Sequence, residues 1–211
     1  MNRGRFITLE GGEGVGKSTN LSFIQQILAQ RQIDVVVTRE PGGTELAEKI
    51  RDLLLTRHTE SITPHAELLL VFAARSQHIH HVILPALNRG QWVLCDRFTD
   101  ATYAYQGGGR NLGMHLIGWL ENTIQCDLKP DLTLVLDAPT DIGLQRAQQR
   151  GKPDRFEVEH KAFFERVRQT YLERARQNSK RYQIIDASQA LPDVQAEIFK
   201  VISRLMNHDR L

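Results

Sequence analysis

The residues from Gly11 to Ser18 have the types and the spacing of a phosphate-binding loop. They fit the pattern G-x-x-x-x-G-K-S/T, and they come shortly after an apolar stretch, Phe6 to Leu9, that predicts a β-strand. Glycines let several backbone N–H groups point at one anion, and the helix that follows presents its positive end to the same phosphate. We therefore expect Lys17 to reach the β- and γ-phosphates of a nucleotide and Ser18 to coordinate Mg²⁺. The alternative is a glycine-rich turn without a ligand.

A second polar pair, Asp96 and Arg97, directly follows the apolar run Trp92 to Cys95. Phosphoryl transfer between two anions needs positive groups, and it needs an acidic residue that organises Mg²⁺ or its waters. Asp96 is the candidate for the metal, and Arg97 is the candidate for a bidentate contact with an acceptor phosphate. A surface ion pair at a strand end is the alternative interpretation of this pair.

A basic stretch further along predicts a small lid over about residues 147–158. Its positive residues lie in or just after a helix that begins near Asp141, and they are Arg146, Arg150, Lys152 and Arg155, interrupted by Gly151 and Pro153. A lid that brings arginine to the site only when both substrates are bound suppresses hydrolysis by water. A solvated helix face is the ordinary explanation of such charges.

Hydrophobic periodicity predicts an α/β protein with five strands that alternate with helices. The expected strands are Phe6–Leu9, Ile33–Val37, Trp92–Cys95, Leu132–Leu136 and Tyr182–Asp186. The expected helices cover Leu21–Leu28, Leu46–Leu55, Glu67 to about Leu87, a stretch after a loop at Gly107–Gly109, a stretch from about Asp141, and Asp193–Met206. This alternation favours a parallel sheet with helices on both faces and with ligands at the carboxyl ends of the strands.

Polar residues follow four of these strands directly, and we expect them to meet at one edge of the sheet. They are the residues of the phosphate loop, the pair Arg39 and Glu40, the pair Asp96 and Arg97, and Asp137. Convergence of this kind is what a substrate site needs.

Composition limits the class of protein. At 211 residues with 41% hydrophobic content, the chain is expected to form one domain over residues 1–211. A formal net charge of only +2, with basic and acidic residues interspersed, does not indicate a nucleic-acid partner. We see no membrane span and no signal peptide. Two distant cysteines, Cys95 and Cys126, favour a reducing cytosol and indicate no disulfide framework.

Several segments together resemble those of the bacterial thymidylate kinases, a family of P-loop nucleoside-monophosphate kinases. The resemblance covers nearly the whole chain, and it is carried by Leu9–Thr19, Thr38–Thr44, Phe72–Arg75, Asp96–Phe98, Tyr105–Gly108, Pro130–Thr133 and Asp154–Glu157. It implies the P-loop NTPase fold and a cytosolic enzyme, usually a homodimer, that converts dTMP and MgATP to dTDP and ADP on the way to dTTP.

The resemblance also implies roles for residues on the acceptor side. Arg97 is expected to bind the dTMP phosphate, Glu13 to lie near the sugar, and Arg75 to hydrogen-bond the base. The other residues expected there are Arg39, Glu40, Phe72, Thr102, Tyr105 and Gln106, of which Phe72 would stack on thymine and Tyr105 would disfavour a ribose 2′-hydroxyl. Many family members have one more residue between the stacking Phe and the Arg, so Val71 is the alternative to Phe72.

On the nucleotide side the resemblance implies contacts with ATP for Gly11, Gly12, Glu13, Gly14, Val15, Gly16, Lys17, Ser18, Thr19 and Arg146. Arg146 would pack against adenine together with the loop around Ala187 and Ser188. Since the phosphate loop has no arginine, the catalytic arginine is expected from the lid, with Arg155 the first choice and Arg150 the second.

Three other functions compete with this one. A monophosphate kinase for another pyrimidine is possible within the same class. A regulatory nucleotide switch is disfavoured because no Asn-Lys-x-Asp motif is present, and a non-catalytic nucleotide-binding module would not need Arg75, Arg97 and a basic lid. Two further features are set aside: His78 and His81 without a third ligand do not make a metal site, and Cys95 at the end of a buried strand is expected to pack, not to react.

Overall fold

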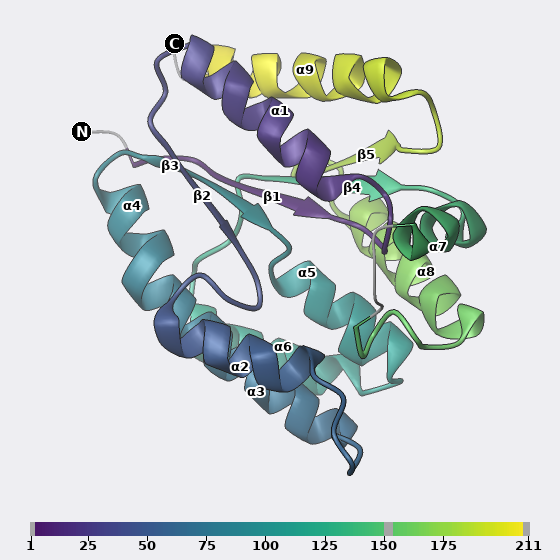
Figure 1. Ribbon diagram of the computed structural model, residues 1–211. Helices are drawn as coiled ribbons and strands as arrows, with labels where there is room; N and C mark the ends of the chain where they lie inside the picture. Colours follow the sequence, from purple (N-terminus) through teal and green to yellow (C-terminus); the bar gives the residue numbers. More distant parts are fainter. Residues whose placement is uncertain (1–2, 150–153, 209–211) are drawn as a thin grey trace.

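The computed structural model describes residues 3–149 and 154–208, and it shows five parallel strands with helices on both faces of the sheet (Figure 1). The spatial order of the strands is β2-β3-β1-β4-β5. In chain order they are β1 (Phe6–Glu10), β2 (Val35–Arg39), β3 (Trp92–Asp96), β4 (Leu132–Asp137) and β5 (Tyr182–Asp186). The expected α/β class and parallel sheet are confirmed.

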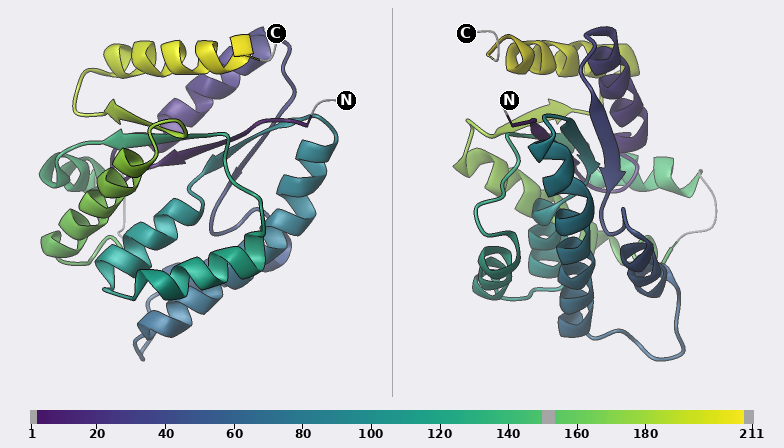
Figure 2. Two further views of the ribbon diagram at one scale, coloured as in Figure 1. Left: turned by 180° about the vertical axis from the view of Figure 1, so that it is seen from behind. Right: turned by 90° about the vertical axis from the view of Figure 1, so that its left-hand side faces the viewer.

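The helices that join these strands fall into two layers (Figure 2). Helices α1 (Lys17–Gln30) and α9 (Leu191–His208) cover one face of the sheet. The other face carries α2 (Glu45–Leu55), α3 (Pro64–His78), the π-helical turn η1 (Ile79–Ile83), α4 (Leu84–Asn88), α5 (Thr99–Thr102), the π-helical turn η2 (Tyr103–Gly109), α6 (Met114–Gln125) and α8 (Lys161–Gln177). Helix α7 (Thr140–Gln148) follows β4 at the edge where the strands end.

The central strand β1 explains why the core divides into two layers. Its side chains alternate between the two faces of the sheet. Ile7 and Leu9 pack in the cluster under α1 and α9, whereas Phe6 packs in a cluster with residues of α4 and β3. All five residues of β1 are buried, so the phosphate loop that follows begins from a rigid support.

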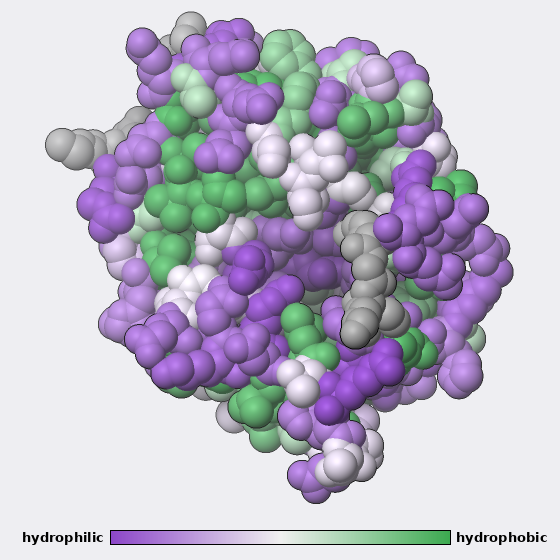
Figure 3. Space-filling view, in the orientation of Figure 1, coloured by the Kyte–Doolittle hydropathy of each residue, from purple (hydrophilic) through white to green (hydrophobic). Residues whose placement is uncertain are grey.

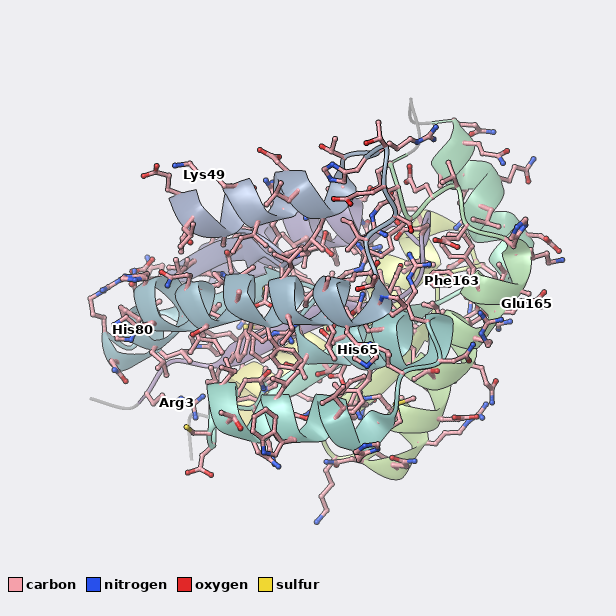
Figure 4. All side chains as sticks on the ribbon, turned by 90° about the horizontal axis from the view of Figure 1, so that it is seen from below. Arg3, Lys49, His65, His80, Phe163 and Glu165 are labelled. Atoms are coloured by element: carbon pink, nitrogen blue, oxygen red, sulfur yellow. The ribbon has the colours of Figure 1, made fainter. Side chains whose placement is uncertain are left out.

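Seen from below, α2, α3 and α6 run side by side under the sheet (Figure 4). Lys49 on α2 extends outward, and His65 and His80 lie at opposite ends of the run formed by α3 and η1. The helix expected from Glu67 to about Leu87 begins at Pro64, where Thr63 accepts the Ala66 N–H at 3.3 Å, and its later part is interrupted by η1. The π-turn directly precedes the segment with Pro85, whose missing N–H and bulky ring disturb a regular helix.

Two local expectations were wrong, and one helix was missed. Strand β2 is Val35–Arg39, two residues later than expected, so Arg39 lies within the strand. Gly107–Gly109 is not a loop, because these glycines form the end of η2, where Gly109 packs so closely on Phe163 that a Cβ would be 2.4 Å from the ring. Helix α8 was not expected, although Phe163, Val167 and Tyr171 have helical spacing and are buried.

No helix in the described ranges, 3–149 and 154–208, is long and apolar enough to cross a membrane.

Candidate functional site

The phosphate loop joins the buried strand β1 to helix α1. Gly11, Gly14 and Gly16 have positive φ values of 135°, 69° and 86°. At Gly14 a Cβ would lie 1.9 Å from the carbonyl oxygen of Gly143 in α7, so no larger residue fits without moving the backbone. The loop therefore leads from a fixed strand into the N-terminus of a helix of 14 residues, which is the geometry that binds phosphate.

Lys17 begins α1 and folds back over the loop. Its Nζ donates hydrogen bonds to the carbonyl oxygens of Gly11 at 3.2 Å and Gly12 at 2.7 Å. Burial, followed by the charge of Arg97, lowers the pKa of Lys17 to about 8. The two residues after it, Ser18 and Thr19, are exposed in the first turn of α1, where they are accessible to a ligand of the loop.

A cleft of about 580 Å³, including its open mouth, lies beside the loop at the ends of β2 and β3. In the space-filling view this edge of the sheet has a hydrophilic hollow, above α2 (Figure 3). Three arginines line the cleft: Arg51 from α2, Arg75 from α3 and Arg97 after β3. Burial and the charges of Arg39 and Arg97 lower the pKa of Arg51. Such a concentration of positive charge suits an anionic ligand. We call this cleft the acceptor cavity.

Arg97 lies between the phosphate loop and the acceptor cavity. Its backbone has a φ of 65°, and its N–H donates to the carbonyl of Leu9 at 2.9 Å. Its guanidinium donates from Nη2 to Glu13 at 2.7 Å and to the Tyr105 hydroxyl at 2.8 Å. Although burial opposes it, the Glu13 carboxylate and other nearby groups raise the pKa of Arg97 well above its ordinary value, so this arginine keeps its charge.

Arg75 is 1% exposed and is oriented by three partners. Its Nε donates to Glu40 at 2.7 Å, and its Nη2 donates to the carbonyl of Phe98 at 3.1 Å and to Thr102 at 2.9 Å. Its remaining nitrogen, Nη1, has no hydrogen-bond partner among the described residues. A buried donor without a partner on the wall of a cavity is a natural contact for an acceptor atom of a ligand.

Glu40 is in turn held from its other side. Its second oxygen accepts a hydrogen bond from Nδ1 of the buried His78 at 2.9 Å, and Nε2 of His78 is 2.6 Å from the Thr38 hydroxyl. His78 is thus a support for Glu40. Among the residues described, no cluster of potential ligands for a metal includes it.

Phe72 does not face the acceptor cavity. Its side chain is 2% exposed and packs with Leu68, Tyr103 and Ile117 between α3 and α6. Val71, one residue earlier, lines the cavity instead. The expectation for Phe72 is therefore wrong, because the packing of α3 against α6 covers its side chain, and Val71 takes the position at the cavity.

Comparisons with known proteins agree with this geometry. A model of the family described as thymidylate kinase matches residues 9–198. The chain belongs to the thymidylate kinase family. A thymidylate kinase from Pseudomonas syringae pv. tomato is 57% identical, with 98% of this chain and 99% of that protein covered, and one from Ectopseudomonas mendocina is 56% identical over 96% and 97%. The crystal structure of a thymidylate kinase from Ehrlichia chaffeensis has a TM-score of 0.78 and 32% identity, covering 95% of this chain and 99% of that one.

Within this thymidylate kinase fold, most of the other residues expected on the acceptor side line the acceptor cavity, and one does not. Glu13, Glu40, Thr102, Tyr105 and Gln106 line the acceptor cavity. Arg39 does not line it, because its side chain is about half exposed and pairs with Glu48 at 2.8 Å. Asp137 also lies apart: it lines a smaller pocket on the other side of the loop, and Arg168 holds it with two hydrogen bonds of 2.7 and 2.9 Å.

Asp96 ends β3 next to Leu9 of β1 in the register of the sheet. Its Oδ1 is buried and has no hydrogen-bond partner among the described residues. A carboxylate oxygen in this state is costly unless a cation or water completes it. The Asp96 carboxylate and the exposed Ser18 hydroxyl in the first turn of α1 are oxygen donors of the kind that Mg²⁺ prefers.

The expected lid arginines have different surroundings. Arg146 in α7 donates to the carbonyl of Ala187 at 2.8 Å, which joins it to the loop after β5. Arg155 donates from Nε to the carbonyl of Leu54 and from Nη2 to Glu67, both at 2.7 Å. Arg150 lies outside the described residues.

Sequence reasoning missed three buried or cavity-lining residues. Arg51 lines the cavity from α2, where the sequence shows only a regular helical pattern. Glu10 is fully buried at the end of β1, where it accepts the Phe98 N–H at 2.7 Å and the Tyr171 hydroxyl at 2.9 Å. Glu67 is equally buried in the first turn of α3. The only signal for Glu10 was its position at the end of an otherwise apolar strand, and acidic residues in first turns, such as Glu67, are common at helix starts.

Proposed function

We propose that this member of the thymidylate kinase family phosphorylates dTMP to dTDP by direct in-line transfer of a phosphoryl group from MgATP. The supporting observation is that the phosphate loop and the arginine-lined cavity open at the same strand ends and meet at the ion pair of Glu13 and Arg97, 2.7 Å apart. Two anionic substrates bound there would be adjacent, so no phosphoenzyme is needed.

On the nucleotide side, ATP is proposed to occupy the loop from Gly11 to Thr19. Lys17 would exchange its two bonds to loop carbonyls for contacts with the β- and γ-phosphates. Arg146, placed beside Ala187, would cover one side of the adenine.

On the acceptor side, Arg97 would hold the dTMP phosphate while Glu13 lies near the sugar. Arg75 would donate its free Nη1 hydrogens to a carbonyl of thymine, with Thr102 and Gln106 beside it. Val71 would contact the base from the position first expected for Phe72. Glu40 acts through Arg75, and Arg39, on the surface, contributes charge at most over a distance.

Two residues suit a bound Mg²⁺: Asp96, with its buried carboxylate oxygen, and Ser18, with its exposed hydroxyl. The ion would neutralise charge on the transferred phosphoryl group. Asp96 would hold the ion or its waters, and Ser18 would fix its position relative to α1.

A lid arginine completes the proposal. To reach the phosphates, Arg155 must release both Glu67 and the carbonyl of Leu54. In this arrangement Arg155 anchors residues 154–159. The arginine for the transferred phosphoryl group is proposed to be Arg155 after such a release or, as the second candidate, Arg150, which lies outside the described residues.

The activity is tested by measuring ADP formation with MgATP and, separately, dTMP, dUMP, dCMP, dGMP, dAMP, CMP and UMP, and with no acceptor. The proposal expects turnover with dTMP far above that with the other acceptors, and little ADP without an acceptor. Turnover that is equal with all acceptors and with none would contradict it. Strong preference for another pyrimidine monophosphate would transfer the assignment to that substrate.

A homodimer is also part of this proposal. The outer faces of α3 and α6 expose large apolar residues, with Leu69 60% and Trp119 63% exposed. These faces lie side by side under the sheet (Figure 4), and a second copy would bury them. Light scattering should report a dimer for the native chain and a monomer for Leu69→Lys/Trp119→Lys. Phe199→Lys on α9 is the control, and a monomeric native chain would refute the dimer.

The proposal further treats residues 1–211 as one kinase domain in the cytoplasm. Neither cysteine is in a disulfide, and Cys95 is buried, which suits a reducing compartment.

A further inference from the structure

Residues Asp154–Glu159 form a strap across one side of the acceptor cavity. The strap is attached to the end of α2: the Arg155 N–H donates to the carbonyl of Leu55 at 3.2 Å, and its Nε donates to that of Leu54. Asp154 stabilises the turn by accepting the N–H groups of Phe156 and Glu157 at 2.8 and 3.0 Å. Asp154 and Phe156 are cavity-lining residues.

Glu67 is the buried carboxylate that anchors this strap. Its side chain is fully buried, and it accepts a hydrogen bond from Arg155 at 2.7 Å and lies 3.2 Å from Nη2 of Arg110. Arg110 also donates to Glu159 at the other end of the strap, at 2.5 Å. Both ends of the strap therefore depend on one carboxylate that belongs to α3.

The same carboxylate orients a residue inside the cavity. Gln106 in η2 donates from Nε2 to Glu67 at 2.7 Å. Glu67 thus connects the strap with the cavity wall without lining the cavity itself.

Phe156 is the part of the strap that reaches the cavity. Its ring lies under the Arg155 guanidinium at 4.4 Å and near that of Arg110 at 5.7 Å, and it meets the Tyr105 ring edge to face at 5.8 Å. The two guanidinium groups beside the ring and the edge contact with Tyr105 fix the orientation of the Phe156 side chain. Three aromatic residues line the cavity, Phe98, Tyr105 and Phe156, and of these Phe156 is the one that is only partly buried.

We propose that Phe156 is a binding residue for the nucleobase of the acceptor and that Glu67 positions it through Arg155 and Arg110. This inference rests on the proposed function, because it concerns the acceptor of that reaction. The ring would shield the base from water on the side that the strap covers. The strap then acts as the outer wall of the acceptor site, and Arg155 serves mainly to anchor it.

The first test is steady-state kinetics of Phe156→Ala, Phe156→Leu and the native chain, with Phe199→Ala on α9 as the matched control. We expect Phe156→Ala to raise KM for dTMP about tenfold, equivalent to about 1.4 kcal/mol, and to change KM for ATP by less than about twofold. Phe156→Leu should restore most of the affinity, and Phe199→Ala should behave as the native chain. A KM for dTMP that is unchanged in Phe156→Ala, or a KM for ATP that rises equally, would overturn the proposal.

The second test separates positioning from general stability. Glu67→Gln should raise KM for dTMP by a factor similar to that of Phe156→Ala, with a much smaller change in kcat. The double variant should raise KM for dTMP by less than the product of the two single factors, because both changes remove the contact of Phe156 and Glu67→Gln adds only the loss of its bond to Gln106. If the two factors multiply, Glu67 does not act through Phe156.

These outcomes are distinct from failure of the proposed function. If the native chain shows no dTMP-dependent ADP formation, the proposed function fails and the inference with it. If the native chain is active and Phe156→Ala has native kinetics, the inference alone is wrong.

Discussion

Arg75 and Glu40 form a buried ion pair in which Nε of Arg75 lies 2.7 Å from the carboxylate, and both side chains are at most 3% exposed. The pair joins α3 to the residue after β2, and it leaves Nη1 of Arg75 available to the acceptor cavity. One interaction thus joins two elements of the fold and orients a side chain at the wall of the cavity.

Removing the arginine of this pair should destabilise the fold strongly. In Arg75→Met the Glu40 carboxylate stays buried without its main counterion, and such losses cost about 3–5 kcal/mol. Urea denaturation measures the difference in the free energy of unfolding. Arg39→Met, which breaks the exposed pair with Glu48, should cost less than about 1 kcal/mol. Equal effects of the two variants would show that burial does not strengthen the first pair.

Replacement of Lys17 should impair turnover without disturbing the acceptor site. Lys17→Met removes the only charged side chain that bonds to the loop carbonyls of Gly11 and Gly12 among the described residues. We expect kcat to fall by about 10²–10³, the usual loss for one preorganised charge-stabilising group. Calorimetry should show dTMP affinity within about twofold of native. Lys49→Met on the outer side of α2 is the control (Figure 4), and a fall in its kcat of the same size would contradict the assignment.

Glu10 makes stability depend on pH. Burial, followed by the charge of Asp100, raises the pKa of Glu10 to about 8 from 4.5. Between these values the folded chain keeps a proton that the unfolded chain has lost, so the contribution of this group to stability falls as pH rises through the window. Glu10→Gln resembles the neutral carboxyl and can still bond to Phe98 and Tyr171.

The measurement is urea denaturation of both proteins from about pH 5 to about pH 8. Relative to the native chain, Glu10→Gln should gain stability as pH rises, by at most about 1.4 kcal/mol per pH unit. A difference between the two proteins that is constant over this range would mean that Glu10 is ionised in the fold.

Asp96 should determine the requirement for Mg²⁺. Asp96→Asn removes the negative charge of this side chain and replaces a carboxylate ligand by a weaker amide oxygen, so we expect the Mg²⁺ concentration for half-maximal rate to rise about tenfold or more. Asp137 ends β4, on the other side of β1, and pairs with Arg168. The Mg²⁺ dependence of Asp137→Asn should therefore stay native. If both variants show the same Mg²⁺ curve as the native chain, Asp96 is not the ligand.

Much of the site was predictable because it follows local rules. The phosphate loop depends on glycines at fixed spacing, and the polar pairs after β2 and β3 are adjacent to apolar runs. The convergence of Glu40 and Arg97 followed from the parallel arrangement of the strands alone. Four strands lie where the sequence places them to within one residue, and β2, partly exposed at the sheet edge, begins two residues later than expected.

The errors concern residues whose role depends on what packs against them. Phe72 and Val71 differ by one position on a helix, and the packing of α3 against α6 decides that Phe72 is covered. Arg155 could have served the phosphates or a carboxylate, and the choice depends on Glu67, 88 residues earlier in the chain. The apolar residues of α8 have helical spacing, but the many charged residues between them weaken the hydrophobic pattern that predicts a helix.

The phosphate loop, the alternation of strands and helices, and the edge of the sheet at which polar residues gather can all be predicted from the sequence, because they depend on backbone conformation and on residues close in the chain. The packed fold is needed to show which face of α3 meets the cavity, that Glu67 holds the strap, and that Phe156 lines the acceptor cavity. These outcomes depend on contacts between distant segments, whose energies are set by burial and by the direction of each side chain and are not encoded in local spacing.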